Sequence, residues 1–406
     1  MKTAGASTRT MIDLFAGAGG LSTGLQGAGF APLYANEYIP QFAATYAENH
    51  PAVWVDSRDI RDVNASDVMR TLGLTPGELD LLAGGPPCQG FSVNAPKRRV
   101  DDRRNHLFHD YLKFAEVFQP KAILIENVPG MVSFEGGATL QAILVALDSL
   151  GYEADVQILY APHFGVPQTR WRTIVLASRR DLRVSEALFP DARHQAPARV
   201  NFTSVHRSKN LVRMPTSTTL PSHTTVKDAL GDLPAFANGE KVPEGAAYAS
   251  LPQNEYQSQL RFGSDGVHNH RSSGLSSINV ERLAYIGPGD NWTSIPLDLL
   301  PAGMRRANRG DHTKRYGRPA PDDLSSTILT KCDPHWGAYF HYEQDRIISV
   351  REAGRIQSFP DTYAFLGSLA DQYAQVGNAV PPLMAQAIGD QLARALESAA
   401  PQTKFG

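Results

Sequence analysis

TMIDLFAGAGG, residues 10–20, joins a short apolar run to a turn that contains three glycines. The apolar run at residues 10–15 predicts a buried strand, and the spacing of the next apolar residues predicts a helix at residues 21–27. A strand, a glycine-rich turn and a helix form the usual first unit of a doubly wound sheet. The stretch therefore predicts that the chain begins with such a sheet.

The same alternation continues along the first half of the chain. Strands that alternate with helices are typical of a mostly parallel sheet. We therefore expect an α/β, doubly wound fold whose ligands bind at the carboxyl ends of the strands. Further strands are expected at residues 32–36, 79–83, 121–126, 152–159 and 173–177, and further helices at residues 41–48, 107–118, 139–150 and 382–397.

Acidic side chains accompany the strands near the glycine turn. Asp13 lies in the first strand, Glu37 follows the second, Asp59 comes later, and the turn contains no lysine or arginine. An acidic residue about 20 positions after such a turn can accept the ribose hydroxyls of a nucleoside. Three carboxylates favour a cationic nucleoside over a pyrophosphate, and S-adenosylmethionine fits. The alternative is that each carboxylate only caps a helix or a turn.

Composition limits the class of protein. The chain has 406 residues, 42% of them hydrophobic, which is enough for a large core that we expect to be divided between two domains. A formal net charge of −2 does not indicate a nucleic-acid binder, although it says little about local patches. No apolar run approaches the roughly 20 residues of a membrane span, and no secretory signal is evident, so we expect a cytoplasmic protein.

A second decisive stretch is GGPPCQGFS, residues 84–92, directly after a predicted strand. Proline fixes the backbone and glycine permits close approach, so this turn would present Cys88 as an accessible thiol. The alternative is a buried structural cysteine. Cys88 and Cys332 are the only cysteines and lie far apart in sequence, which argues against a disulfide framework and fits a reducing compartment.

Six short motifs follow one another along the chain. They are DLFAGAGG at residues 13–20, PPCQGFS at 86–92, ENV at 126–128, QTRWR at 168–172, REAGRIQSFPD at 351–361 and QVGNAVPP at 375–382. In order and wording they resemble the motifs of the DNA (cytosine-5) methyltransferases of bacterial restriction-modification type. The resemblance implies the sheet of S-adenosylmethionine-dependent methyltransferases and a second, smaller, irregular DNA-recognition domain between residues 172 and 351.

The resemblance also implies a mechanism that agrees with elementary chemistry. Carbon 5 of cytosine is a poor nucleophile, so a thiolate, here Cys88, first adds to carbon 6. Glu126 matches the residue that holds a proton at N3, and a dry cleft would favour its protonated form. Arg172 matches the residue that contacts the base, with Arg170 in support, and both lie in a strand expected at residues 169–175. The cytosine must be flipped out of duplex DNA, and no residue is evident as the base that removes the carbon 5 proton.

Two further sets of binding residues are expected, and no metal. The polar loop at residues 92–105 follows the nucleophile and is expected to close over phosphates, with Gln89, Ser92, Lys97, Arg98, Arg99 and Arg104 as DNA contacts. The cofactor contacts are Asp13, Phe15, Ala16, Gly17, Gly19, Gly20, Glu37, Tyr38, Asp59, Ile60, Pro87, Leu107 and Asn378.

The middle of the chain has few periodic segments. Its densest basic window either contacts DNA or forms a solvated loop, and the sequence favours neither. Trp292 and Trp336 are expected in the core of a small domain. The window contains Arg305, Arg306, Arg309, Lys314 and Arg315.

The expected domains are catalytic at residues 1–185, target-recognition at 186–345, hinge and support at 346–374, and a return to the catalytic domain at 375–406. The expected partner is double-stranded DNA, bound by a monomer away from membranes; whether a cognate restriction endonuclease acts separately stays open. Methylation of transfer RNA and a catalytically silent DNA-binding protein are the alternatives. The long middle region argues against the first, and the intact catalytic motifs argue against the second. The sequence does not reveal which DNA word is recognised.

Overall fold

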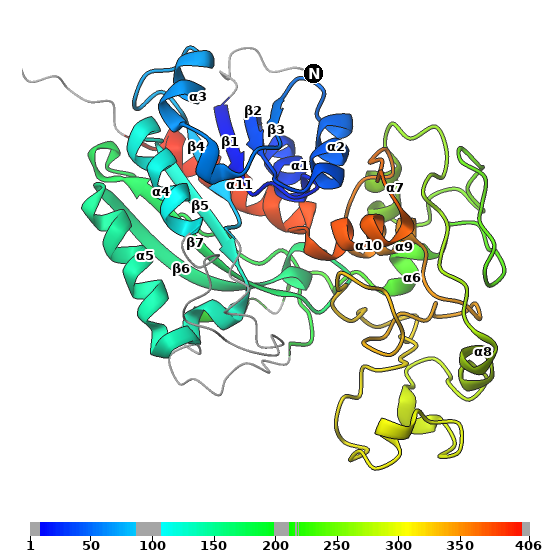
Figure 1. Ribbon diagram of the computed structural model, residues 1–406. Coiled ribbons are helices and arrows are strands. Elements are labelled where there is room, and N and C mark those ends of the chain that lie inside the picture. Colours follow the sequence, from blue (N-terminus) through cyan, green and yellow to red (C-terminus); the bar gives the residue numbers. More distant parts are fainter. Residues whose placement is uncertain (1–8, 87–106, 199–210, 216, 218, 400–406) are drawn as a thin grey trace, which may run out of the picture.

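The computed structural model describes residues 9–86, 107–198, 211–215, 217 and 219–399. At its centre is a seven-stranded sheet in the order β3-β2-β1-β4-β5-β7-β6 (Figure 1). Neighbouring strands are parallel except at β7, which runs antiparallel to β5 and β6. This confirms the α/β, mostly parallel sheet. The strands are β1 (Arg9–Leu14), β2 (Phe30–Asn36), β3 (Trp54–Asp56), β4 (Leu81–Gly84), β5 (Ala122–Asn127), β6 (Tyr152–Tyr160) and β7 (Trp171–Arg179).

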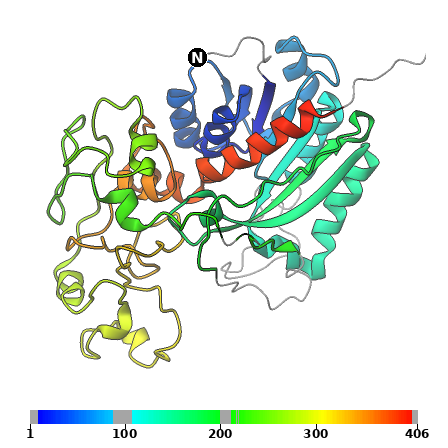
Figure 2. The same ribbon diagram turned by 180° about the vertical axis from the view of Figure 1, so that it is seen from behind.

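Side chains that alternate along each strand enter two different cores. In β5, Ile123 and Ile125 pack with α3 (Ala65–Thr71), α4 (Leu107–Phe118) and α5 (Ala138–Ser149). Leu124 points to the other face and packs with α1 (Gly20–Gly27) and α11 (Pro382–Glu397). Figures 1 and 2 show α4 and α5 on one face of the sheet and α11 on the other. Both faces of the sheet are therefore covered, as a parallel sheet requires.

The strands predicted at residues 10–15, 32–36, 79–83, 121–126, 152–159 and 173–177 all form, and their ends agree with the prediction to within two residues. The helix α2 (Pro40–Asn49) also forms where the sequence predicts one. The sequence gives no sign of β3 or α3, because β3 has only three residues and its Trp54 is 37% exposed. The strand expected at residues 169–175 is wrong at its start, since β7 begins at Trp171 and leaves Arg170 outside it.

Much of the chain between β7 and α11 forms a separate, irregular lobe with little regular structure (Figures 1 and 2). Its larger core joins α6 (Val226–Leu230) and α7 (Glu255–Arg261) to α9 (Val350–Ile356) and α10 (Leu369–Asn378). A smaller core, near α8 (Ser277–Leu283), surrounds Trp292 and Tyr316. As expected, α9 carries its apolar residues inward. The boundaries of the four expected domains stay predictions.

Buried ion pairs support the irregular lobe where regular hydrogen-bond ladders are few. Arg355 is enclosed and lies 2.5 Å from a carboxylate oxygen of Asp232 and 2.6 Å from one of Asp361. Arg346 pairs with Glu352 at 2.6 Å beside it. Removal of one member of such a pair would leave a buried charge without its partner, which costs far more than the pair itself contributes.

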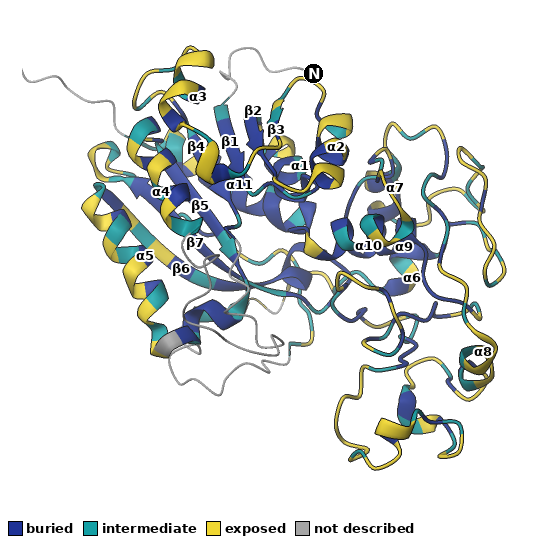
Figure 3. Ribbon diagram, in the orientation of Figure 1, coloured by how far each residue is buried: buried dark blue, intermediate teal, exposed yellow. Residues whose placement is uncertain are grey.

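Two tryptophans of the irregular lobe, Trp292 and Trp336, differ in burial. Trp292 is 1% exposed in the smaller core, as predicted, whereas Trp336 is 56% exposed, so the prediction of a core position is wrong for Trp336. Figure 3 shows the exposed surface of this lobe beside the buried centre of the sheet. Within the described residues, no helix has the length and apolar character needed to cross a membrane.

Candidate active site

The glycine turn after β1 is held against the end of β2 by Glu37. One Glu37 carboxylate oxygen accepts from the backbone N–H of Gly17 at 2.8 Å, and the other accepts from Ile39 N–H at 2.8 Å. Phe15 has a φ of 57°, which is rare for a bulky residue and typical of a functional site. A side chain at Gly17, whose φ is 58°, would meet no atom within 4 Å. The turn therefore faces open space beside a carboxylate, as a nucleoside site requires.

Asp13 lies beneath this turn and is 1% exposed. One carboxylate oxygen accepts from the Ser22 hydroxyl at 2.6 Å, and the other has no hydrogen-bond partner. Burial, with a smaller contribution from Glu37, raises the pKa of Asp13 to about 7. Together with Glu37, Asp13 gives this turn two acidic groups, which favour a cationic ligand.

The raised pKa of Asp13 predicts a pH-dependent stability. The folded chain retains a proton that the unfolded chain loses between its usual pKa of 3.8 and about 7. The free energy of unfolding should therefore fall as the pH rises through this window, by up to about 4 kcal/mol. Asp13→Asn should remove that slope. Urea denaturation at several pH values checks this, and equal slopes in both proteins would contradict it.

Gly19, unlike Gly17, is closely packed against other side chains. Its φ is 88°, and a side chain there would lie 2.6 Å from the Tyr363 hydroxyl and 2.8 Å from His50 Nε2. Tyr363 also donates to the carbonyl oxygen of Ala18. The close approach thus lets the recognition lobe rest directly on the cofactor turn. Tyr363 and His50 were not expected at the site, and no motif in the sequence indicates their contact with it.

The other expected cofactor residues lie around the same end of the sheet. Asp59 caps the short helix Ile60–Asp62 and pairs with Arg61 at 2.5 Å, and its role toward a cofactor stays a prediction. Tyr38 is 65% exposed next to Glu37. Asn378 ends α10 and is exposed. Of the other expected cofactor residues, Ala16 and Gly20 lie in the glycine turn, and Leu107 begins α4.

Glu126 and Arg172 meet where β5 ends and β7 begins. Arg172 Nε lies 2.6 Å from Glu126 Oε1, and both side chains are nearly buried. Burial lowers the pKa of Arg172, and the adjacent carboxylate opposes that shift. Gly85, three residues before Cys88, is hydrogen-bonded through its N–H to Leu14 O at 3.3 Å, so the strand that leads to the thiol also borders the cofactor turn.

Gly85 packs directly against the Glu126 carboxylate. A methyl group there would lie 3.1 Å from Glu126 Oε2, which forces a shift of a few tenths of an ångström. We expect Gly85→Ala to lower kcat about 10-fold with little change in thermal stability. Gly274→Ala is the control, because its methyl group would make an ordinary 3.4 Å contact far from the sheet. Equal kcat values for the two variants would contradict the prediction.

Arg170 points elsewhere. It is 1% exposed, and its guanidinium donates to the carbonyl oxygens of Ile328 at 3.2 Å, Gly377 at 2.9 Å and Ala379 at 2.8 Å. It therefore ties the start of β7 to the recognition lobe and to the segment that carries Asn378. The predicted strand implied that Arg170 and Arg172 point to the same face. In the structure they contact different groups, since Arg172 pairs with Glu126 and Arg170 binds backbone carbonyl oxygens.

Several expected residues lie outside the described part of the chain, namely Cys88, Pro87, Gln89, Ser92, Lys97, Arg98, Arg99 and Arg104.

The later basic window is described. Arg305 donates to the carbonyl oxygens of Leu300 and Asp298, Arg309 donates to that of Thr293, and Arg306 is exposed. Lys314 reaches across to the Thr169 hydroxyl at 3.4 Å. The structure thus brings Lys314 to the catalytic domain.

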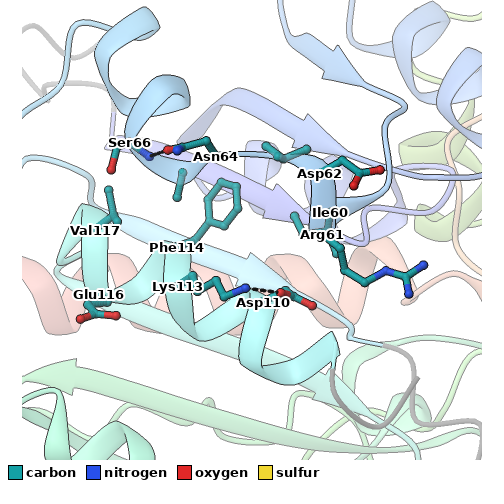
Figure 4. Close-up of a pocket in the computed structure, with 12 residues that line it drawn as sticks. Ile60, Arg61, Asp62, Asn64, Ser66, Asp110, Lys113, Phe114, Glu116 and Val117 are labelled. Atoms are coloured by element: carbon teal, nitrogen blue, oxygen red, sulfur yellow. Dashed lines mark hydrogen bonds and ion pairs between the residues drawn. The ribbon is translucent and has the colours of Figure 1, made fainter. Parts of the chain in front are cut away.

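A pocket of about 400 Å³ lies beside this site, between residues 60–66 and α4 (Figure 4). Its walls include Ile60, Asp110 and Lys113, and the last two form an ion pair at 2.8 Å. Mixed charge and an open shape favour no particular ligand. Across the described ranges, no cluster of His, Cys, Asp or Glu side chains could hold a metal ion.

Comparison with known proteins decides the family. A model of the C-5 cytosine-specific DNA methylases matches residues 9–394, which is nearly the whole chain. The chain belongs to this family. It is a DNA (cytosine-5-)-methyltransferase, and the transfer RNA alternative finds no support in this match.

Named relatives align with most of the chain. The type II methyltransferase M.AgeI of Thalassovita gelatinovora is 35% identical over 94% of this chain and 98% of its own. M1.HphI of Haemophilus parahaemolyticus is 34% identical over 94% and 86%. A crystal structure from E. coli, described as a DNA modification methyltransferase encoded within a prophage, covers 96% of this chain and 99% of that one with a TM-score of 0.71 and 24% identity, which shows the shared fold.

Membership of this family implies the use of S-adenosylmethionine, and the site fits it. The open space at Gly17, the Glu37 carboxylate and the unpartnered buried oxygen of Asp13 form an acidic cradle. The sulfonium and ammonium charges of the cofactor suit such a cradle, since opposite charges at short range attract most strongly in a dry site.

Proposed function

We propose that the enzyme methylates carbon 5 of a cytosine that is flipped out of a specific duplex DNA sequence, through a covalent adduct of Cys88 at carbon 6. The observation that carries the proposal is the Glu126–Arg172 pair, at 2.6 Å, beside the strand that leads to Cys88. A carboxyl group and a guanidinium so placed can hold the N3 and O2 edge of one cytosine.

The proposed steps use this chain's own groups. The Cys88 thiolate adds to carbon 6, and Glu126 delivers a proton to N3, so the ring becomes an enamine without a full negative charge. S-adenosylmethionine supplies the methyl group that carbon 5 accepts. A water molecule takes the carbon 5 proton, the Cys88 thiolate leaves carbon 6, and the N3 proton returns to the Glu126 carboxylate, which restores the aromatic ring. Arg172 keeps the Glu126 carboxyl group aimed at N3 throughout.

Glu37, Asp13 and Gly17 are proposed to bind the ribose and the methionine end of the cofactor, with Phe15 and Ile60 against the adenine and Asn378 beside the methionine. Pro87, Tyr38, Asp59 and Leu107 would complete that site. The basic residues at 97–99 and 104, with Gln89 and Ser92, would contact DNA after the flip. In the recognition lobe the proposed contacts are Arg305, Arg306, Arg309, Lys314 and Arg315.

A labelled-methyl assay tests the proposal. The enzyme is incubated with labelled S-adenosylmethionine and either duplex DNA or bulk transfer RNA, and the labelled base is identified. Label in 5-methylcytosine of DNA is expected, and label confined to transfer RNA would overturn the proposal. Mapping methylated cytosines in DNA of expressing cells would then reveal the recognised sequence.

We further propose a role as the modification half of a type II restriction-modification pair, acting as a monomer in the cytoplasm with a separate endonuclease as its counterpart. The support is that the relatives M.AgeI and M1.HphI carry type II names. DNA from cells that express the enzyme should then resist one endonuclease that cuts at the mapped sequence. Cleavage at fully methylated sites by every such endonuclease would contradict this role.

A further inference from the structure

Trp336 is the feature of the recognition lobe that the site so far leaves unexplained. Its side chain is 56% exposed, more than Trp54 at 37% and far more than the buried Trp292. The guanidinium of Arg315 lies over its ring at 5.1 Å, and the His335 ring meets it edge-on at 4.9 Å. Single exposed aromatic residues are common on protein surfaces. Trp336 differs in its rigid support and in the position of its segment next to the sheet.

The support of Trp336 is rigid. Residues 311–318 and 333–340 pack against each other through the backbone, with Tyr316 N–H donating to Pro334 O at 2.6 Å. A side chain at Gly317 would lie 2.6 Å from Ala338 Cβ, so the two segments touch as closely as two backbones can. Tyr316 anchors both to the smaller core. A large apolar ring is thus held out into solvent at little further cost in conformational entropy.

The base of the same segment is fastened to the catalytic domain. Thr327 donates to the Thr169 carbonyl, and the Ile328 carbonyl accepts from Arg170 at 3.2 Å. The Tyr339 hydroxyl accepts from Leu329 N–H at 3.1 Å, which closes residues 329–339 into a loop. We call these residues the Trp336 loop. The base of this loop thus lies against Arg170, two residues before Arg172, and Lys314 reaches the neighbouring Thr169 hydroxyl at 3.4 Å.

We propose that Trp336 packs against the DNA bases beside the flipped cytosine, and that Arg315, held over its ring, contacts the adjacent phosphate. The proposal deepens and rests on the proposed function. Trp336 supplies an exposed aromatic ring, and Arg315 and Lys314 supply two cationic side chains. The base of the loop contacts Arg170, two residues before Arg172. Such a set matches the stacking and phosphate contacts by which proteins hold unpaired nucleic acid.

Steady-state kinetics on duplex DNA test the proposal. Trp336→Ala should lower kcat/KM for DNA about 10-fold or more, while Trp336→Phe keeps most of it. The KM for S-adenosylmethionine should not change, because the contacts of the Trp336 ring are with His335 and Arg315 and not with Glu37 or Asp13. Arg315→Gln should reduce the salt dependence of binding by about one phosphate contact. Phe262→Ala is the control, since Phe262 is 86% exposed after α7 and lies in another part of the lobe.

Tryptophan fluorescence separates this role from a structural one. Duplex DNA should quench the emission of the wild type more than that of Trp336→Phe, and the difference reports Trp336 itself. Equal quenching, or an activity of Trp336→Ala within twofold of the wild type, would overturn the proposal. In either case, methylation of DNA by the wild type would leave the proposed function intact, whereas its absence would remove the proposed function.

Discussion

Cys88→Ala is expected to lower methyl transfer by on the order of 10⁴-fold or more, because the proposed mechanism depends on addition of the Cys88 thiolate to carbon 6 of cytosine. Cys332 offers no substitute. It is 6% exposed in the larger core of the recognition lobe, and burial raises the pKa of its thiol well above the ordinary value. It therefore stays a protonated thiol away from the site.

The measurement is a pair of assays on both cysteine variants. Methyl transfer is followed with labelled cofactor, and the covalent adduct is trapped on duplex DNA that contains 5-fluorocytosine, since fluorine at carbon 5 blocks the final elimination. Cys332→Ala should keep both the activity and the adduct, which a denaturing gel displays. An adduct that persists in Cys88→Ala but is lost in Cys332→Ala would reverse the assignment.

Glu126→Gln is expected to lower kcat by about 10²- to 10⁴-fold. Glutamine can still accept from Arg172 but cannot deliver a proton to N3, so the negative charge of the thiolate adduct would stay on the ring. The KM for S-adenosylmethionine should remain near its normal value, because Glu126 lies in β5, whereas the proposed cofactor residues Asp13 and Glu37 lie in β1 and directly after β2. Single-turnover kinetics separate this chemical step from product release.

Arg172→Lys provides the matched comparison for Glu126→Gln. Lysine keeps the charge but lacks the planar fork that holds the carboxyl group at 2.6 Å. The two residues act as one unit, so the double variant should lose far less than the product of the two single losses. Fully multiplicative losses would show that Glu126 and Arg172 act independently and would contradict the proposed pairing.

The sheet was predictable because its strands are apolar runs with clear ends. Leu124 and its neighbours in β5 are fully buried on both faces, and such strands appear in sequence as continuous hydrophobic stretches. The short β3 escaped prediction because three residues with an exposed tryptophan form no such stretch. In the recognition lobe, contacts between distant segments decide the structure, and no local pattern records them.

The sequence predicted which residues belong to the candidate site, but it did not predict which atoms those residues contact. Motif order named both Glu126 and Arg170, yet only the structure shows Arg170 bound to carbonyl oxygens of Gly377 and Ala379. Trp336 was misassigned because a tryptophan in an irregular region is more often buried than exposed. Its exposure depends on the close packing of Gly317 against Ala338, which the sequence does not reveal.

The place of α11 on the sheet has a consequence for the synthesis of the enzyme. The apolar side chains of Met11 and Leu25 are covered by a helix that begins at Pro382, roughly 350 residues after α1 ends. At about 5–20 residues per second, a ribosome needs on the order of 20–70 s to reach it. Throughout that interval one face of the nascent sheet lacks its cover, so the catalytic core can be completed only after the whole recognition lobe has been translated.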